Sequence, residues 1–243
     1  MKQPPHQLAM SEQLLLAIAE QIKLPLLQIS SQAELALLRK TTDDDYGAAQ
    51  IRVLATNALQ LVDAYSLSLR LDHQFNSELA PETASVASIL YDASSQLKDY
   101  AKLYNVQLEL NIGGKFGPVL VHKKGLQSAI VGLASAFIEA LPTQQHPNNR
   151  TIVQLATHRC RYGIVAGVYA DIPGLNNETL RRGRKLYGNS RQPLVDVSHT
   201  GAAGIFIADA IFRAMRLRLQ VSRHHRLYGL GVVLHPSSQM MLV

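Results

Sequence analysis

The chain has 243 residues, of which 47% are hydrophobic and 17% are charged, and its formal net charge is +6. This composition is typical of a folded globular protein and excludes the disordered and fibrous classes. A single cysteine, Cys160, excludes an internal disulfide and suits a reducing cytoplasm, where we expect the protein. No apolar run is long enough to cross a bilayer, and residues 1–10 lack the hydrophobic segment of a secretory signal.

The two parts of the chain differ in charge. Residues 1–100 hold 7 basic and 12 acidic residues, a net of −5, whereas residues 101–243 hold 17 and 6, a net of +11. Basic side chains gather in residues 181–191 and 213–226. Such clusters can bind phosphates or nucleic acid. Because no aromatic-interleaved motif accompanies them, a solvated surface is favoured and a nucleic-acid partner is not expected.

The first part predicts a helical hairpin. A long helix is expected over residues 11–40, because apolar residues recur seven apart at Leu15, Ile22, Ile29 and Ala36. A polar turn at residues 41–47 precedes a second helix, which reaches about Leu71. Its apolar stripe consists of Ile51, Leu54, Ala58, Leu61 and Tyr65. A second apolar edge, formed by Leu14, Leu37, Ala55 and Val62, remains open, so we expect two hairpins to associate in a homodimeric four-helix bundle.

The second part mixes helices and strands. Periodicity predicts helices at residues 86–103, 124–141 and 202–215, and strands at residues 106–110, 119–121, 151–160, 163–170, 217–222 and 228–235. A polar, basic segment at residues 173–200 separates the last helix from the preceding strand pair. The expected domains are a helical hairpin at residues 1–72, a linker at 73–84 and a sandwich at 85–243. The fold class is therefore α+β, a helical hairpin followed by an α/β sandwich.

One segment of the first helix carries a family resemblance. Ala19-Glu20-Gln21-Ile22-Lys23-Leu24-Pro25-Leu26 resembles the phosphoacceptor helix of bacterial sensor histidine kinases, whose motif is His-Glu-x-Arg-x-Pro-Leu. In this alignment Glu20 stands at the acceptor histidine and Gln21 at the glutamate that helps to move the proton. A glutamate can form only a labile acyl phosphate, and an amide cannot act as a base. The resemblance therefore implies a degenerate acceptor position.

The order of elements after the linker resembles the ATP-binding domain of the same kinases, which is shared with gyrase-type ATPases. The resemblance places Ala136 at the asparagine that holds magnesium, and Ala170 at the aspartate that binds adenine. Asp171 follows one residue later, a position that faces the other side of a strand. In the last motif only Gly204 keeps its place. The implied degenerate nucleotide pocket comprises Ala136, Ala170, Ile172, Gly174, Gly201 and Gly204.

Three functions follow from these expectations. The favoured hypothesis is a catalytically inactive, dimeric histidine-kinase-like scaffold without a cofactor, which docks a response-regulator receiver domain or another signalling protein through Lys23, Leu24, Pro25 and Leu26. A second is a module that binds another ligand, or a nucleotide without magnesium, in the remodelled pocket. A third is a divergent kinase or phosphotransferase, which the missing hairpin histidine disfavours.

A metal site is also considered. His158, Cys160, His224 and His225 lie on predicted strands or at their ends and could meet across a sheet. No paired-ligand spacing accompanies them, and residues two apart share a face in any strand. No metal is therefore expected.

Overall fold

The computed structural model describes residues 23, 26–37, 45–73, 81–141, 151–172, 175–178, 180 and 202–236. The chain divides into two compact units, Met1–Leu79 and Ala80–Val243. The boundary between the units falls within the residues expected to form a linker, while the roles assigned to residues 1–72 and 85–243 stay predictions. None of the described helices is long and apolar enough to cross a membrane.

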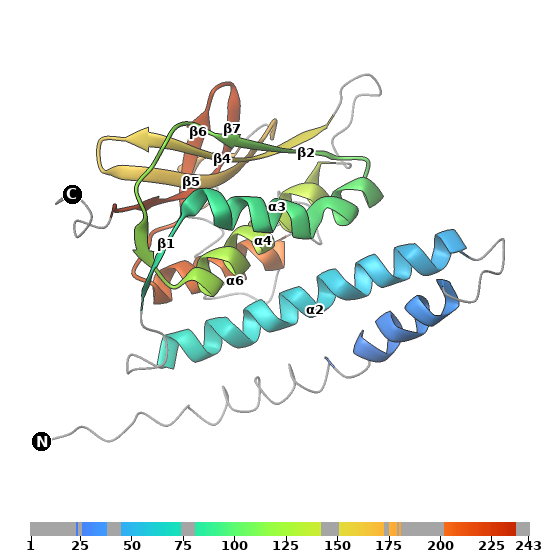
Figure 1. Ribbon diagram of the computed structural model, residues 1–243. Helices are drawn as coiled ribbons and strands as arrows, with labels where there is room; N and C mark the ends of the chain where they lie inside the picture. Colours follow the sequence, from blue (N-terminus) through green and yellow to red (C-terminus); the bar gives the residue numbers. More distant parts are fainter. Residues whose placement is uncertain are drawn as a thin grey trace, which may run out of the picture. The chain divides into compact units, whose positions relative to one another are not determined.

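The described residues of the first unit are helical (Figure 1). Helical residues 26–37 lie beside α2 (Asp45–His73), and an ion pair of 2.7 Å joins Lys23 Nζ to Asp63 Oδ1 of α2. The predicted hairpin is therefore present among the described residues. Its buried apolar residues are mostly small: Ala33, Ala48, Ala55, Ala64 and Leu71.

One expectation about the hairpin is wrong. The stripe predicted to join its two helices included Ile29, Ile51 and Leu54, but all three side chains are exposed. Leu27 and Leu35 are exposed as well. Alanines occupy the buried positions instead, because a seven-residue repeat shows that a helix is apolar on one side but not which side meets its neighbour. Several larger apolar side chains among the described residues of this unit are therefore left exposed.

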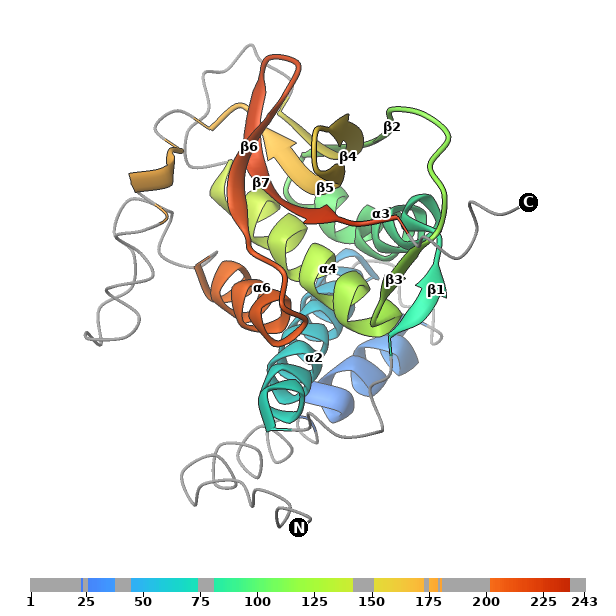
Figure 2. The ribbon, with the colours of Figure 1, turned by 90° about the vertical axis from the view of Figure 1, so that its left-hand side faces the viewer.

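The second unit is a sheet with helices on one face (Figures 1 and 2). The five-stranded sheet has the order β2-β4-β5-β7-β6, in which β2 and β4 are parallel and the other neighbours are antiparallel. Helix α4 lies between α3 and α6 under this sheet (Figure 2). A separate pair, β1 (Glu82–Ala84) and β3 (Val119–Val121), is antiparallel. The remaining elements are α3 (Val86–Leu103), β2 (Gln107–Ile112), α4 (Lys123–Ala140), β4 (Ile152–Cys160), β5 (Gly163–Ala170), α6 (Ala202–Ala214), β6 (Gln220–His224) and β7 (Leu227–Leu234).

Local chemistry explains where the two long helices begin. The Ser85 side chain accepts a hydrogen bond from the Ser88 backbone N–H at 3.4 Å and caps α3. His122 Nδ1 accepts from the Gly125 N–H at 2.9 Å and caps α4 in the same way. The apolar positions predicted for α3 are buried, and α4 is buried along nearly its whole length. Helix α4 is thus the centre of the core.

Most predicted elements of this unit are confirmed, with two differences. Residues 82–84, expected in the linker, form strand β1, in which Ala84 pairs with Val119 of β3. A three-residue strand has no sequence pattern of its own and is recognised only by this pairing. The strand expected from residue 217 begins at Gln220. Arg216 has a positive φ of 59°, and the Leu217 N–H bonds to the Phe212 carbonyl, so residues 216 and 217 complete the end of α6.

Candidate functional site

Helices α4 and α6 meet at two glycines, Gly132 and Gly204. A Cβ atom on Gly204 would lie 2.3 Å from the Gly132 carbonyl oxygen and 3.4 Å from the Ala136 Cβ. A Cβ atom on Gly132 would lie 3.2 Å from the Gly204 carbonyl oxygen. The backbones therefore approach as closely as glycine permits. As a result, the start of α6 packs directly on the part of α4 that contains Ala136, and both Ala136 and Gly204 are buried.

This packing gives Gly204 a role that the sequence did not predict. A phosphate-binding glycine presents its backbone N–H to an open site at the start of a helix. Gly204 instead lies within the described helix α6 and faces α4. Glycine is needed at this position because a larger side chain would collide with the backbone of α4.

The end of β5 carries the other expected pocket residues. Ala170 is fully buried and pairs with Val153 and Tyr228. Asp171 is exposed, as its one-residue offset from Ala170 predicts. The Ile172 N–H donates to the Ala170 carbonyl at 3.1 Å, so the chain turns away from the sheet immediately. The side chain at residue 170 is thus a buried methyl group without a polar atom.

The sequence analysis did not identify the buried Asp209 or the hydrogen-bonded pair of Tyr100 and Glu139. Asp209 on α6 is buried, and its Oδ2 lies 3.4 Å from Arg213 Nε. Between α3 and α4, the Tyr100 hydroxyl donates to Glu139 Oε1 at 2.5 Å. Burial raises the pKa of the Glu139 carboxyl above its usual range, and burial together with the bond to Glu139 raises the pKa of Tyr100. Tyr100 and Glu139 are 39 residues apart, so no local pattern reveals the bond.

Histidines gather over the outer face of the sheet. The rings of His158 and His224 are stacked with centroids 5.2 Å apart, and the Tyr169 ring lies 5.3 Å from that of His224. His225 makes an edge contact with His224 at 4.3 Å. The part of the chain that the structure describes contains no group of three His, Cys, Asp or Glu residues able to hold a metal ion.

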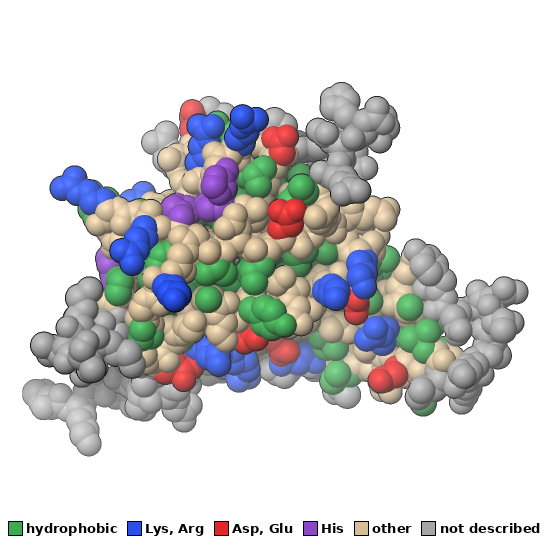
Figure 3. All heavy atoms as spheres, turned by 45° about the horizontal axis from the view of Figure 1, so that its top comes forward, with side chains coloured by type: hydrophobic (Ala, Val, Ile, Leu, Met, Phe, Trp, Pro, Cys, Tyr) green, Lys and Arg blue, Asp and Glu red, His purple; other side chains and the backbone are tan. Residues whose placement is uncertain are grey.

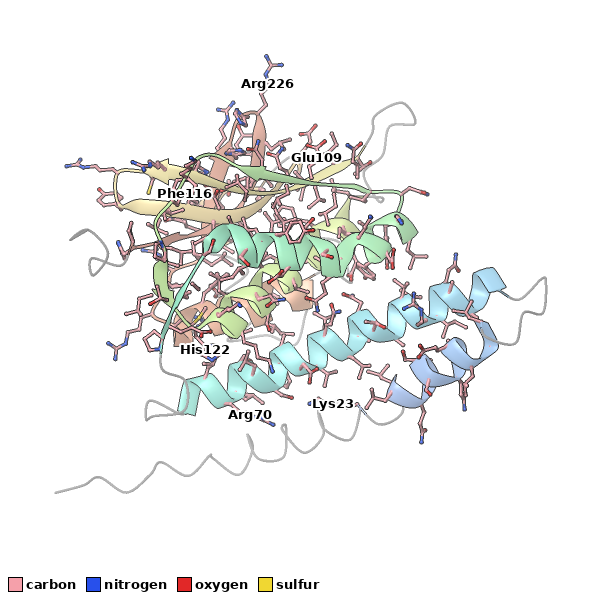
Figure 4. All side chains as sticks on the ribbon, in the orientation of Figure 1. Lys23, Arg70, Glu109, Phe116, His122 and Arg226 are labelled. Carbon is pink, nitrogen blue, oxygen red and sulfur yellow. The ribbon has the colours of Figure 1, made fainter. Side chains whose placement is uncertain are left out.

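The expected docking residues lie in the first unit. Lys23, which is labelled in Figure 4, forms an ion pair with Asp63 of α2. Leu26 is half-buried. Lys23 therefore helps to hold the two helices together. The remaining expected site residues fall outside the described residues: Glu20, Gln21, Leu24, Pro25, Gly174 and Gly201.

Three histidines that are buried or half-buried predict how stability depends on pH. Burial lowers the pKa of His122, His158 and His224, and in the latter two the neighbouring His225 adds to the effect. The unfolded chain therefore binds more protons than the folded chain as the pH falls below about 6.5, the ordinary histidine value. The contribution of these neutral histidines to the free energy of unfolding is complete above that pH and is lost as the pH falls below it.

We expect the melting temperature to fall between pH 7 and pH 5, as followed by circular dichroism. A His158→Gln, His224→Gln variant should show a shallower fall. The variant of the exposed His235, His235→Gln, should keep the slope of the native chain. A melting temperature that stays constant or rises over this range would contradict the burial of neutral imidazoles.

Comparison with known proteins shows which solved structures have a similar fold. No protein-family model matches the chain, and no curated protein matches its sequence. Full-length ShkA in complex with AMPPNP shares 15% identity over 93% of this chain, with a TM-score of 0.59, and the chain spans 46% of the length of ShkA. The histidine kinase AdeS of Acinetobacter baumannii shares 12% identity over 86% of this chain and 95% of its own, with a TM-score of 0.48. A bacterial phosphotransferase shares 8% identity over 95% of this chain and 100% of its own, with a TM-score of 0.47.

The likeness to ShkA concerns the fold. The chain has a histidine-kinase-like fold, an N-terminal pair of helices followed by an α+β unit like the kinase ATPase domain. The α+β, histidine-kinase-like fold expected from the sequence is thereby confirmed, while the dimeric four-helix bundle stays a prediction.

Proposed function

We propose that the chain is a catalytically inactive, histidine-kinase-like protein of two-component signalling. It acts as a dimeric scaffold in the cytoplasm and docks a receiver domain, or another signalling protein, through the helix around Lys23, Leu24, Pro25 and Leu26. The observation that carries this proposal is the close packing of α6 on α4 at Gly204, Gly132 and Ala136. In the kinase alignment this is where nucleotide phosphates and magnesium are held.

The chemistry of the pocket supports inactivity. Magnesium requires oxygen ligands at near-ideal geometry, and the methyl group of Ala136 offers none. A carboxylate that accepts the adenine amino hydrogen is replaced by the buried Ala170. Glu20 and Gln21 stand at the acceptor and base positions of the alignment, and neither side chain supports phosphoryl transfer from ATP. The alignment therefore indicates that four functions are lost: the phosphoacceptor, the proton-accepting residue, magnesium binding and adenine recognition.

The exposed apolar residues of the hairpin support dimerisation. Leu27, Ile29 and Leu35 on the first helix are exposed, as are Ile51 and Leu54 on α2. Exposed apolar side chains gathered on one element commonly mark an interface. A second copy of the same hairpin would cover them by forming a four-helix bundle. The dimer then presents two equivalent docking helices.

Incubation with γ-³²P-labelled ATP and magnesium tests the inactivity. We expect no label on the chain and none on an added receiver domain. The variant Glu20→His restores an acceptor imidazole and should also remain unlabelled, because Ala136 and Ala170 still cannot hold the nucleotide. An active histidine kinase in the same buffer is the positive control. Label on the native chain would overturn the proposal, and label on Glu20→His alone would show that the pocket still binds ATP.

A further inference from the structure

Three arginines of the second unit lie over aromatic rings. The Arg159 Cζ is 5.9 Å from the centroid of Phe116, and the Arg161 Cζ is 5.9 Å from that of Tyr162. The Arg223 Cζ is 5.5 Å from the centroid of Tyr228. Arg159 and Arg161 belong to the β4–β5 hairpin, and Arg223 belongs to the β6–β7 hairpin. In each hairpin, arginine therefore lies over an aromatic ring. The pairing of Arg159 with Phe116 joins residues far apart in the sequence and was not predicted from it.

These pairs remain open to solvent. All three arginines are exposed, and the side chains of Tyr162 and Tyr228 are 67% and 42% exposed. Stacking on a ring orients a guanidinium while leaving N–H groups at its edge to bind phosphate. Arg223 already donates from Nε to the His225 carbonyl at 3.1 Å, which fixes its orientation further. The arginines are thus positioned and still charged at the surface.

No acidic residue offsets this charge within the two hairpins. Residues 152–170 contain two arginines, residues 220–234 contain two, and neither range contains Asp or Glu, although exposed Asp171 follows β5 and Glu109 of β2 lies beside β4. Residues 80–243 as a whole hold 18 basic and 9 acidic residues, a net of +9. A surface of this kind attracts a polyanion over a distance of about one Debye length.

The histidines join the two hairpins. His158 of β4 stacks on His224 of β6, and Tyr169 of β5 contacts both rings, at 6.1 and 5.3 Å between centroids. In Figure 3 histidine side chains lie between basic side chains on this face. Figure 4 shows Arg226 at the tip of the β6–β7 hairpin, pointing away from the strands. The ring contacts join the two hairpins on one face, whereas Arg159 and Arg223, as the neighbouring residues on their strands, point to the other face. Tyr162 and Tyr228 lie near opposite ends of β5, because Tyr162 precedes Gly163 and Tyr228 pairs with Ala170. A bound polyanion would therefore have to span the length of β5 to reach both tyrosines.

We propose that the β4–β5 and β6–β7 hairpins form a binding surface for single-stranded nucleic acid. The arginines neutralise phosphates, and Tyr162 and Tyr228 stack on bases whose faces are free in a single strand. Exposed tyrosines beside the arginines favour this partner over an acidic protein surface, which offers carboxylates but no planar bases. Stacking on a ring tolerates any base, so the surface has little sequence preference.

Fluorescence anisotropy with a labelled, mixed-sequence single-stranded DNA of about 20 nucleotides tests the proposal on the full chain. Binding is expected at about 50 mM salt, with an affinity that falls as salt rises, at a logarithmic slope of about −0.7 for each phosphate contacted. The variant Arg161→Ala, Arg223→Ala, Arg226→Ala should bind about tenfold or more weakly. The variant Tyr162→Ala, Tyr228→Ala, whose charge is unchanged, should also lose about tenfold.

The matched control removes the same charge from the helical layer. The variant Lys98→Ala, Lys102→Ala, Lys123→Ala alters exposed residues of α3 and α4 and should bind within about twofold of the native chain. Arg161→Lys, Arg223→Lys keeps the charge and serves if the alanine variant does not fold. Absence of binding at low salt would overturn the proposal. Equal affinity of the tyrosine variant, or equal competition by polyglutamate, would assign the surface to an acidic protein instead.

Discussion

Replacing Gly204 with alanine is expected to destabilise the second unit by about 2–3 kcal/mol, although alanine favours a helix by about 1 kcal/mol over glycine. The added methyl group would lie 2.3 Å from the Gly132 carbonyl oxygen, which belongs to the backbone and cannot rotate away. Helices α4 and α6 would have to separate. Gly132→Ala should cost less, since its Cβ would meet the Gly204 oxygen at 3.2 Å.

The control for this prediction is Gly117→Ala in the same unit. Gly117 is exposed and has no positive φ, and a methyl group added there would meet no heavy atom within 4 Å. The change should therefore be neutral or slightly stabilising, by about 0.5 kcal/mol. Urea unfolding followed by circular dichroism measures all three variants. A Gly204→Ala variant as stable as the native chain would contradict the close packing of α6 on α4 at this position.

Replacing Ile51 and Leu54 with aspartate is expected to convert the proposed dimer to a monomer. Both side chains lie on α2 and are 49% and 44% exposed in the isolated chain. Covering a large apolar side chain stabilises by about 1.5–3 kcal/mol, so losing two of them, with two charges added, should raise the dissociation constant about 100-fold or more. Size-exclusion chromatography with light scattering measures the mass directly.

A matched control is Tyr91→Asp. Tyr91 lies on α3 of the second unit and is 64% exposed, so it undergoes the same change from apolar to charged outside the hairpin. This variant should remain dimeric. A monomeric native chain, or a double variant that keeps the dimer mass and the native helix content, would contradict the role given to the hairpin.

Local sequence patterns predicted the long elements of the fold. The buried positions of α3 repeat at helical spacing, and Arg161-Tyr162 forms the turn between two apolar strands, so both the helix and the β4–β5 hairpin follow from periodicity and turn chemistry. Short β1 could not be found in this way, because it depends on pairing with β3. The exposure of Ile29 and Ile51 was also hidden, since periodicity does not identify the partner of an apolar face.

The candidate site shows the same limit more clearly. The sequence indicates that Ala136 and Ala170 lack the expected polar atoms, because residue identity alone determines what a side chain can coordinate. The closure of α6 on α4 depends on a contact between Gly132 and Gly204, 72 residues apart. The Tyr100–Glu139 hydrogen bond and the pair of Arg159 with Phe116 likewise join distant residues. Such contacts become visible only after the chain has folded.

Isothermal titration calorimetry with ATP tests the central claim most directly, because inactivity is attributed to a pocket that cannot hold a magnesium nucleotide. The native chain is titrated with ATP in the presence and absence of magnesium, with ADP as a control. The packing of Gly204 on Gly132 and the methyl groups of Ala136 and Ala170 predict no binding heat up to about 1 mM nucleotide. Binding at about micromolar affinity, strengthened by magnesium, would contradict the proposed loss of nucleotide binding and favour the alternative of a divergent kinase.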